Sequence, residues 1–217
     1  MATLEDPSLA FLARIESNGG LRTAIVPRGD GYVYSGLTGI MPAALAAGSI
    51  AFLMRSPANA NRIAYIDRIR VQYTTIAAFT APVTAGRRLQ LFRGINSTGT
   101  SGGAAPANNS VAKKNPSTAS NSIFDATQGG DVRIATTAGL TLTGGVWETE
   151  PLATMPLTHV GTAGANVEQI FEFSATVSAE LVLTPNQYLT LRTPAAFDAG
   201  GTWQLAVKVD WREALAL

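Results

Sequence analysis

Few residues in this sequence have the types and spacing that catalysis requires. His159 carries the only imidazole, because the 217-residue chain has one His and no Cys. Cysteine nucleophiles, disulfides, thiolate metal sites and pairs of imidazole ligands are therefore excluded. A serine hydrolase would need His159 as its base, yet we expect no serine at a strand-to-helix nucleophile elbow. We expect a structural or surface role for His159.

Glu148 and Glu150 are the carboxylates whose spacing most resembles that of a site. Two residues apart, they could share one face of a strand, as the acid pair of a glycosidase or as ligands of a calcium ion. Pro151 follows immediately, and its surroundings are typical of a loop. Surface charge is therefore the simpler interpretation of both side chains.

Asp67 is unusual because the alternation of the sequence places it on an apolar face, between Tyr65 and Ile69. A buried carboxylate needs a partner. We therefore expect a buried ion pair or hydrogen bonds from backbone N–H groups. A strand bulge that turns Asp67 outward would satisfy it equally well.

Phosphate-binding motifs do not occur: the chain contains neither GxxxxGK[ST] nor GxGxxG followed by a helix. Arg28-Gly29-Asp30 spells the integrin-binding tripeptide, but with Gly31 it equally predicts a hairpin turn. We therefore expect no catalytic residue, no cofactor and no metal ion, and we predict that the protein is not an enzyme. A net charge of +1 also argues against nucleic acid or a membrane surface as partner.

The composition indicates contact with other proteins. Charged residues make up 14% of the chain, against roughly 25% in an average soluble domain. A surface with little charge and many small neutral residues suits a subunit that is buried among neighbours. A GC-rich genome that favours Ala, Gly and Thr codons would give the same composition.

Residues 1–20 predict a helical arm. Asp6-Pro7 is a typical helix start, and Asn18-Gly19-Gly20 predicts its end. A helix of about ten residues is marginal alone in water, so its apolar stripe must pack on its own domain or on a neighbouring subunit. The positions at helical spacing and those that widen the stripe are Leu9, Phe11, Leu12, Ala13, Ile15 and Glu16.

Residues 21–217 predict a single β domain, because the period changes from helical to alternating. Thr202–Arg212 alternates strictly and Arg62–Ile76 is a second long strand. The shorter candidates are Leu21–Val26, Gly31–Ser35, Ser49–Met54, Arg87–Arg93, Val132–Thr137, Gln169–Val177, Ala179–Leu183 and Tyr188–Thr193. Such strands without intervening helices predict an all-β, antiparallel β-sandwich. A jelly roll, with its eight strands, and an immunoglobulin-like sandwich remain open.

Two long excursions interrupt the predicted strands, at residues 94–122 and 138–166. Loops of this length are usually functional or disordered. The first contains Lys113 and Lys114 as its only charges, and the second contains Trp147 in a predicted hairpin. We expect the excursions to reach neighbouring molecules; a solvent loop is the alternative. The candidate interaction residues are Leu9, Phe11, Leu12, Ile15, Lys113, Lys114 and Trp147.

Two parts of the chain resemble virion structural proteins of tailed bacteriophages. The stretch from Gly19-Gly20-Leu21-Arg22 to Pro27, with Tyr34 and 40–52, is similar to the opening of small proteins encoded in head and tail gene clusters. The ending, at 183–189 and 201–205, resembles jelly-roll subunits of phage particles.

The resemblance implies a component of the virion without catalysis. It would be a capsid decoration (cement) protein that binds the major capsid protein of the shell as a homotrimer. The alternative is a glycan- or receptor-binding module of a tail fibre or baseplate, which would need an exposed aromatic platform such as Trp147.

Overall fold

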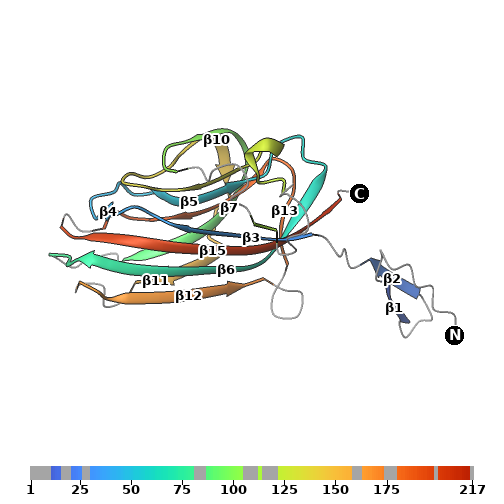
Figure 1. The fold of residues 1–217 in the computed structure, drawn as a ribbon, viewed down its shortest axis with the longest axis horizontal. Coiled ribbons are helices and arrows are strands. Elements are labelled where there is room, and N and C mark those ends of the chain that lie inside the picture. Colours follow the sequence, from blue (N-terminus) through green and yellow to red (C-terminus); the bar gives the residue numbers. More distant parts are fainter. Residues whose placement is uncertain are drawn as a thin grey trace.

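The computed structural model of the chain describes residues 11–15, 21–25, 30–80, 87–104, 112–113, 122–157, 163–173, 180–197 and 200–215. The regular structure of these residues is β-strand except for the 3₁₀ turn Ala126–Gln128. Two antiparallel sheets pack face to face as a sandwich (Figure 1). The all-β sandwich that the sequence predicts is confirmed.

The first sheet, called the β6 sheet, has the strand order β12-β6-β15-β3-β8, and β13 also pairs with β6 and β4 with β15. The bounds of these strands are β12 Asn166–Glu172, β6 Arg62–Ala77, β15 Thr202–Leu215, β3 Asp30–Leu37, β8 Ala112–Lys113, β13 Leu181–Leu183 and β4 Met41–Pro42.

The second sheet, called the β7 sheet, has the strand order β10-β7-β14-β5-β9, and β11 also pairs with β7. The bounds of these strands are β10 Thr141–Trp147, β7 Arg88–Ser101, β14 Gln187–Arg192, β5 Ile50–Arg55, β9 Asp131–Ile134 and β11 Ala153–Pro156.

The topology is defined by the sheet to which each successive strand of the chain belongs. The principal strands β3, β5, β6, β7, β10, β12, β14 and β15 alternate between the sheets, except that β7 and β10 are neighbours in one sheet. Of these principal strands, the first, β3, pairs with the last, β15. This is a jelly roll, since an immunoglobulin domain pairs successive strands such as A with B and D with E. Of the two sandwiches left open by the sequence, the jelly roll is confirmed.

Strand β15 lies in the middle of the β6 sheet and supplies much of the core. Its predicted inward positions are all buried: Trp203, Leu205, Val207, Val209 and Trp211. Tyr73 of β6 stacks on Trp203 with ring centroids 5.6 Å apart, and Tyr32 of β3 stacks on Trp211 at 5.8 Å. Burying one such side chain stabilises the fold by roughly 1.5–3 kcal/mol.

Strand β6 contains a bulge at Asp67. On β15, Asp210 pairs with Arg68 but Trp211 pairs with Ile66, so Asp67 is an extra residue without a partner position. The bulge shifts the alternation by one residue and turns the carboxylate outward. Arg212 Nε donates to Asp67 Oδ1 at 2.9 Å. The bulge that the sequence left as one alternative is thus observed, with an ion pair that is half-exposed rather than buried.

The predicted N-terminal helix is wrong over residues 11–15. These residues form strand β1 (Phe11–Ile15), which pairs antiparallel with β2 (Leu21–Ile25) in a two-stranded sheet of their own. The rest of the predicted helix lies outside the described residues. The same apolar residues that suit a helix also alternate at 11, 13 and 15, and a short helix is marginal, so a nearby strand partner decides the structure. Figure 1 shows this hairpin beyond one end of the sandwich.

The predicted excursions are also partly strand. Strand β7 continues to Ser101 because residues 94–101 pair with β10, and β8 adds to the edge of β3. Residues 105–111 and 114–121 lie outside the described part. In the described part of 138–166, β10 and β11 both pair with β7 and not with each other, so no hairpin is seen there. Local composition could not indicate that β10 and β11 pair with β7, because β7 lies about fifty residues earlier in the chain.

Candidate interaction surfaces

The interaction residues predicted from the sequence lie on three different sheets. The N-terminal candidates in β1 belong to the separate hairpin, Lys113 ends β8 opposite Tyr32 of β3, and Trp147 ends β10 in the β7 sheet. Leu9 and Lys114 lie outside the described residues. The described candidates therefore do not form one contiguous site.

The residues considered for chemistry do not form a catalytic arrangement in the described structure. His159 lies outside it, as do Arg28 and Gly29. Glu148 pairs with Arg93, whose Nη2 lies 2.5 Å from Glu148 Oε1, and Glu150 is exposed. Among the described residues, no three His, Asp or Glu side chains gather as a metal ion would require.

The outer face of the β7 sheet carries a group of rings and one cation, which we call the aromatic–arginine cluster: Phe92, Trp147, Tyr188 and Arg192. Side chains alternate along a strand, so Tyr188 and Arg192 point outward while Leu189 and Leu191 of β14 are buried in the core. The registers place Gly94 of β7 directly between Tyr188 of β14 and Trp147 of β10.

Trp147 is engaged by every other member of this cluster. Its ring meets Tyr188 edge to face, with centroids 4.9 Å apart, and Phe92 at 6.2 Å. The Arg192 guanidinium carbon lies 4.8 Å from the Trp147 centroid and 4.5 Å from that of Phe92, which is a cation–π geometry. Trp147 is therefore a packed residue at a strand end rather than a free aromatic platform on a loop.

Tyr188 fits only because two neighbouring residues are glycines. A Cβ at Gly94 would lie 2.3 Å from the ring of Tyr188, and one at Gly145 would lie 2.8 Å from its hydroxyl. Gly145 also has a φ of 96°, which side chains rarely tolerate. The ring is completely buried, and this burial raises the pKa of Tyr188 to about 12 although the charge of Arg192 lowers it. The phenol is therefore protonated at neutral pH.

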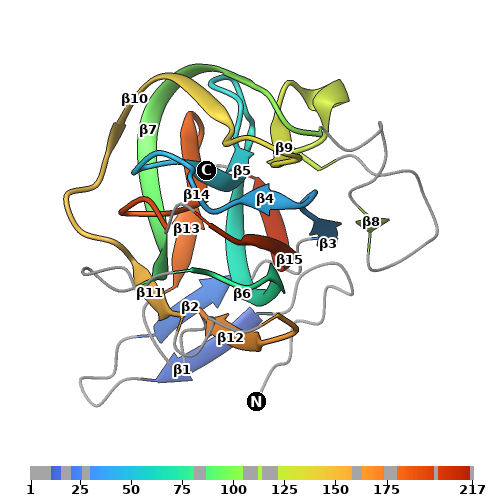
Figure 2. The ribbon, with the colours of Figure 1, turned by 90° about the vertical axis from the view of Figure 1, so that its left-hand side faces the viewer.

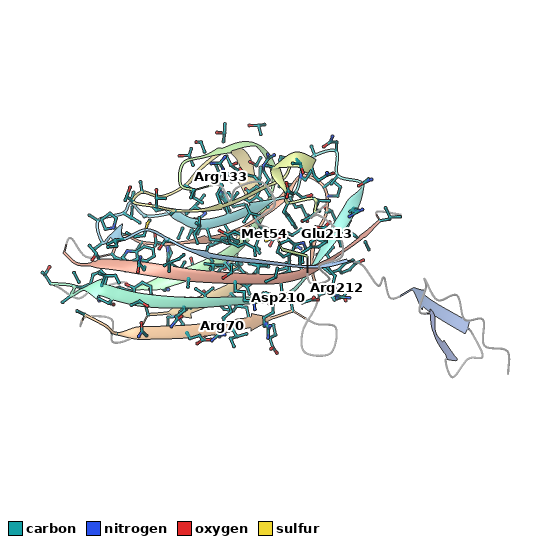
Figure 3. All side chains as sticks on the ribbon, viewed as in Figure 1. Met54, Arg70, Arg133, Asp210, Arg212 and Glu213 are labelled. Carbon is teal, nitrogen blue, oxygen red and sulfur yellow. The ribbon has the colours of Figure 1, made fainter. Side chains whose placement is uncertain are left out.

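A buried carboxylate that the sequence analysis missed lies at one end of the sandwich. The inward alternation of β15 continues past Trp211 to Glu213 (Figure 3). Ser122 Oγ donates to Glu213 at 2.6 Å, Trp211 Nε1 at 2.9 Å and the Ile123 N–H at 3.1 Å, and Arg62 Nη1 lies 3.7 Å away. Burial raises the pKa of Glu213, and these donors and Arg62 oppose that rise.

Glu213 anchors the segment that follows the first excursion. Phe124, in the same segment, packs edge to face on Trp211 with centroids 5.5 Å apart. The alternation of β15 could have indicated an inward Glu213. Its partner Ser122 lies 91 residues earlier, and no local signal indicates that contact. All the hydrogen bonds of Glu213 contribute to the stability of the fold.

The outer face of the β6 sheet carries ion pairs instead of a site. Arg68 Nη2 lies 3.2 Å from Asp210 Oδ2, and Arg70 pairs with Glu168 across the sheet. The guanidinium of Arg70 lowers the pKa of Glu168. Figure 3 shows Arg70, Asp210 and Arg212 on this side, with Arg133 on the opposite side of the sandwich.

No protein-family model matches this chain, and no curated protein matches it in sequence. Within the described residues, no helix has the length and apolar character needed to cross a bilayer. Function must therefore be inferred from the surfaces described above and from the resemblance of the sequence.

Proposed function

We propose that the chain is a non-enzymatic structural subunit that assembles with other proteins into a larger particle. The observation that carries this proposal is the β1–β2 hairpin, which forms a sheet separate from the sandwich. The resemblance of the sequence supplies the finer proposal. In it, the chain is a decoration (cement) protein of a tailed-phage virion that binds the major capsid protein as a homotrimer.

The hairpin supports assembly because it needs a surface to pack on. A single two-stranded hairpin is at best marginally stable in water. The strands, FLARI and LRTAI, are mostly apolar in sequence, and the sandwich already has a core made from its own two sheets. A neighbouring subunit would supply the missing surface, and repeated contacts of this kind would add avidity.

The surface of the sandwich also suits protein contact. Val146 of β10 and Ile95 of β7 lie directly opposite each other, and they are 62% and 42% exposed. Adjacent apolar side chains on a surface favour an interface. The glycan-binding alternative would need a free aromatic ring, and Trp147 instead packs against three side chains.

We expect the hairpin to be required for oligomer formation. In the full-length chain, Phe11→Ser together with Ile15→Ser should reduce the sedimenting mass from that of the oligomer to that of one chain. The sandwich should keep its melting temperature, because β1 and β2 form a sheet of their own and pair with neither sheet of the sandwich. Removal of residues 1–27 should have the same effect.

The matched control is Lys208→Gln, a surface change on an exposed residue of β15, which should leave the mass unchanged. An oligomer that survives both hairpin variants would remove the hairpin from the proposal. A chain that is monomeric in every variant and ignores undecorated phage shells would refute the proposed function itself.

A further inference from the structure

Strand β12 forms an open edge of the β6 sheet. It pairs with β6 along one side, and no strand of the described residues pairs with its other side. Figure 2 shows β12 at the margin of the sandwich, next to β6. A strand edge without a partner presents a row of N–H and C=O groups to any further strand. The geometry of β12 therefore allows one more strand to join the sheet.

The backbone groups that face away from β6 belong to the even-numbered residues of β12. The residues that flank the strand, Ala165 and Phe173, each make a backbone hydrogen bond to β6 at 2.9 Å. Alternate residues of an antiparallel strand bond to the same side. Residues 166, 168, 170 and 172 therefore direct their N–H and C=O groups outward. In agreement, the carbonyl of Ile170 accepts from the side chain of Gln169 at 3.4 Å.

The other edges of the two sheets are interrupted, occupied or short. Strand β10 has a bulge at Gly144, and Gly144 and Gly145 have φ angles of 66° and 96°. On β9, Ile134 exchanges two backbone hydrogen bonds with Ala104. Strand β8 covers part of the edge of β3, and β11 has only four residues. Among the described strands, β12 is therefore the edge with the longest regular stretch, seven residues.

The outer face of β12 is acidic with an apolar residue between the acids. Glu168 and Glu172 are exposed, and Ile170 between them is 44% exposed. The strand contains no Lys or Arg. Glu168 pairs with Arg70, and a carboxylate has enough acceptor sites to bind a second guanidinium as well. On the inner face, Phe171 is buried in the core.

The β1–β2 hairpin has the complementary pattern. Each of its strands contains one arginine and no acid, and the register places Arg14 directly opposite Arg22. Like charges at opposite positions destabilise a strand pair, so an acidic neighbour would stabilise this one. The positions on the other side of the hairpin are 11, 13, 15, 21, 23 and 25, and most of them are apolar in the sequence.

The hairpin of the same chain cannot reach this edge. The five residue steps from Ile25 to Asp30 span at most about 18 Å. A strand added beyond β12 lies four strand spacings from β3, which is about 19 Å. Asp30 also lies at the level of Ala64 of β6, whereas β12 ends at the level of Arg68, which adds roughly 10 Å along the strands. A hairpin on this edge must therefore come from a second copy.

We propose that the β1–β2 hairpin of one chain adds to the β12 edge of a second copy of the chain. Its arginine side lies over Glu168 and Glu172, and its apolar side continues the inner face of the sheet beside Phe171. Main-chain hydrogen bonds give such strand addition its affinity. Each chain gives one hairpin and accepts another, and head-to-tail contacts of this kind close into rings. This inference rests on the proposed assembly function and names the surface that receives the hairpin.

The first test blocks the edge in the full-length chain. Proline has no N–H, and a sheet tolerates it on an edge strand where the N–H faces solvent. Ile170→Pro should therefore remain folded by circular dichroism, while its sedimenting mass falls from that of three chains to that of one. Ile170→Thr is the matched control, since it keeps the N–H and a β-branched side chain, and it should remain a trimer.

A second set of variants tests the charges and does not depend on proline. Glu168→Arg together with Glu172→Arg should raise the dissociation constant of the oligomer at least about tenfold, because like charges then meet at the contact. Adding Arg14→Glu and Arg22→Glu to the same chain should restore the dissociation constant of the parent. Changes in the hairpin could not repair a folding defect of β12, so restoration would identify the contact itself.

The outcomes separate this inference from the proposed function. A folded Ile170→Pro protein that remains a trimer would overturn the β12 site, as would a fourfold charge variant that associates no better than Glu168→Arg/Glu172→Arg. In either case, loss of the oligomer in Phe11→Ser/Ile15→Ser would still support assembly through the hairpin. A parent chain that is monomeric at every concentration would overturn both.

Discussion

Replacing Gly94 by alanine is expected to destabilise the protein by about 3 kcal/mol, the upper end of the usual cost of overpacking. The new methyl group would lie 2.3 Å from the ring of Tyr188. That ring cannot move aside, because it is completely buried and its hydroxyl lies against Gly145. Thermal unfolding should show a melting temperature lower by roughly 10 °C.

Three further variants identify Tyr188 as the cause. Gly99→Ala in the same strand should change stability by less than about 0.5 kcal/mol, because its new Cβ would meet only Thr143, at 4.0 Å. Tyr188→Leu should make Gly94→Ala much less costly, whereas Tyr188→Phe should not, since the ring remains. An equal cost of Gly94→Ala in the Tyr188→Leu background would contradict the packing described here.

Glu213→Ala is expected to cost about 3 kcal/mol, because it leaves several buried donors without an acceptor. The donors are the Ser122 hydroxyl, the Ile123 N–H and Trp211 Nε1. Glu213→Gln keeps one acceptor oxygen and should cost less. Urea unfolding measures both differences.

Asp67→Ala is the matched control for this prediction. It also removes an ion-paired carboxylate from the β6 sheet, but Asp67 and Arg212 are 32% and 33% exposed. Such pairs contribute roughly 0–1 kcal/mol. Equal losses from Asp67→Ala and Glu213→Ala would show that the bonds of Glu213 add nothing beyond those of a surface pair.

The raised pKa of Glu213 also predicts the direction of a pH effect. Between its ordinary value of 4.5 and its higher value in the folded state, the folded protein binds this proton more tightly than the unfolded chain does. The proton-linked stabilisation is therefore complete below 4.5 and is lost as the pH rises through the folded-state pKa. Glu213→Gln removes this titration.

Urea unfolding of the parent and of Glu213→Gln from about pH 4 to about pH 8 tests the direction. The difference in unfolding free energy, parent minus variant, should fall as the pH rises. A difference that rises with pH would mean that the pKa of Glu213 is lowered, and a constant difference would mean that it is unchanged.

The sequence predicted well those elements whose environment is set by their own pattern. Strand β15 is buried along one face and solvated along the other, so its alternation predicted both the strand and its inward residues. The turn residues between strands indicated many short strands, and their number indicated a sandwich. Strand order was open, because it depends on pairing between distant segments.

The failures of prediction have the same physical origin. The pattern of residues 11–15 suits a helix and a strand alike, and the pairing with β2 decides between them. Residues 94–101 are rich in Gly, Ser and Thr and looked like a loop, but β10 supplies a hydrogen-bonded partner. Ile66 faces the core only because the bulge at Asp67 shifts the alternation of inward and outward side chains along β6 by one residue.

The candidate sites could be predicted only in part. Trp147 was selected from the sequence, but as an exposed contact residue, and nothing local indicates that Tyr188, Phe92 and Arg192 surround it.

The solution mass of the intact chain tests the proposed assembly most directly. Sedimentation equilibrium over a range of protein concentrations would measure it without a shell or any other partner. We predict the mass of three chains, formed through the β1–β2 hairpin. The mass of a single chain at every concentration would contradict self-assembly and leave the hairpin without the surface that it needs.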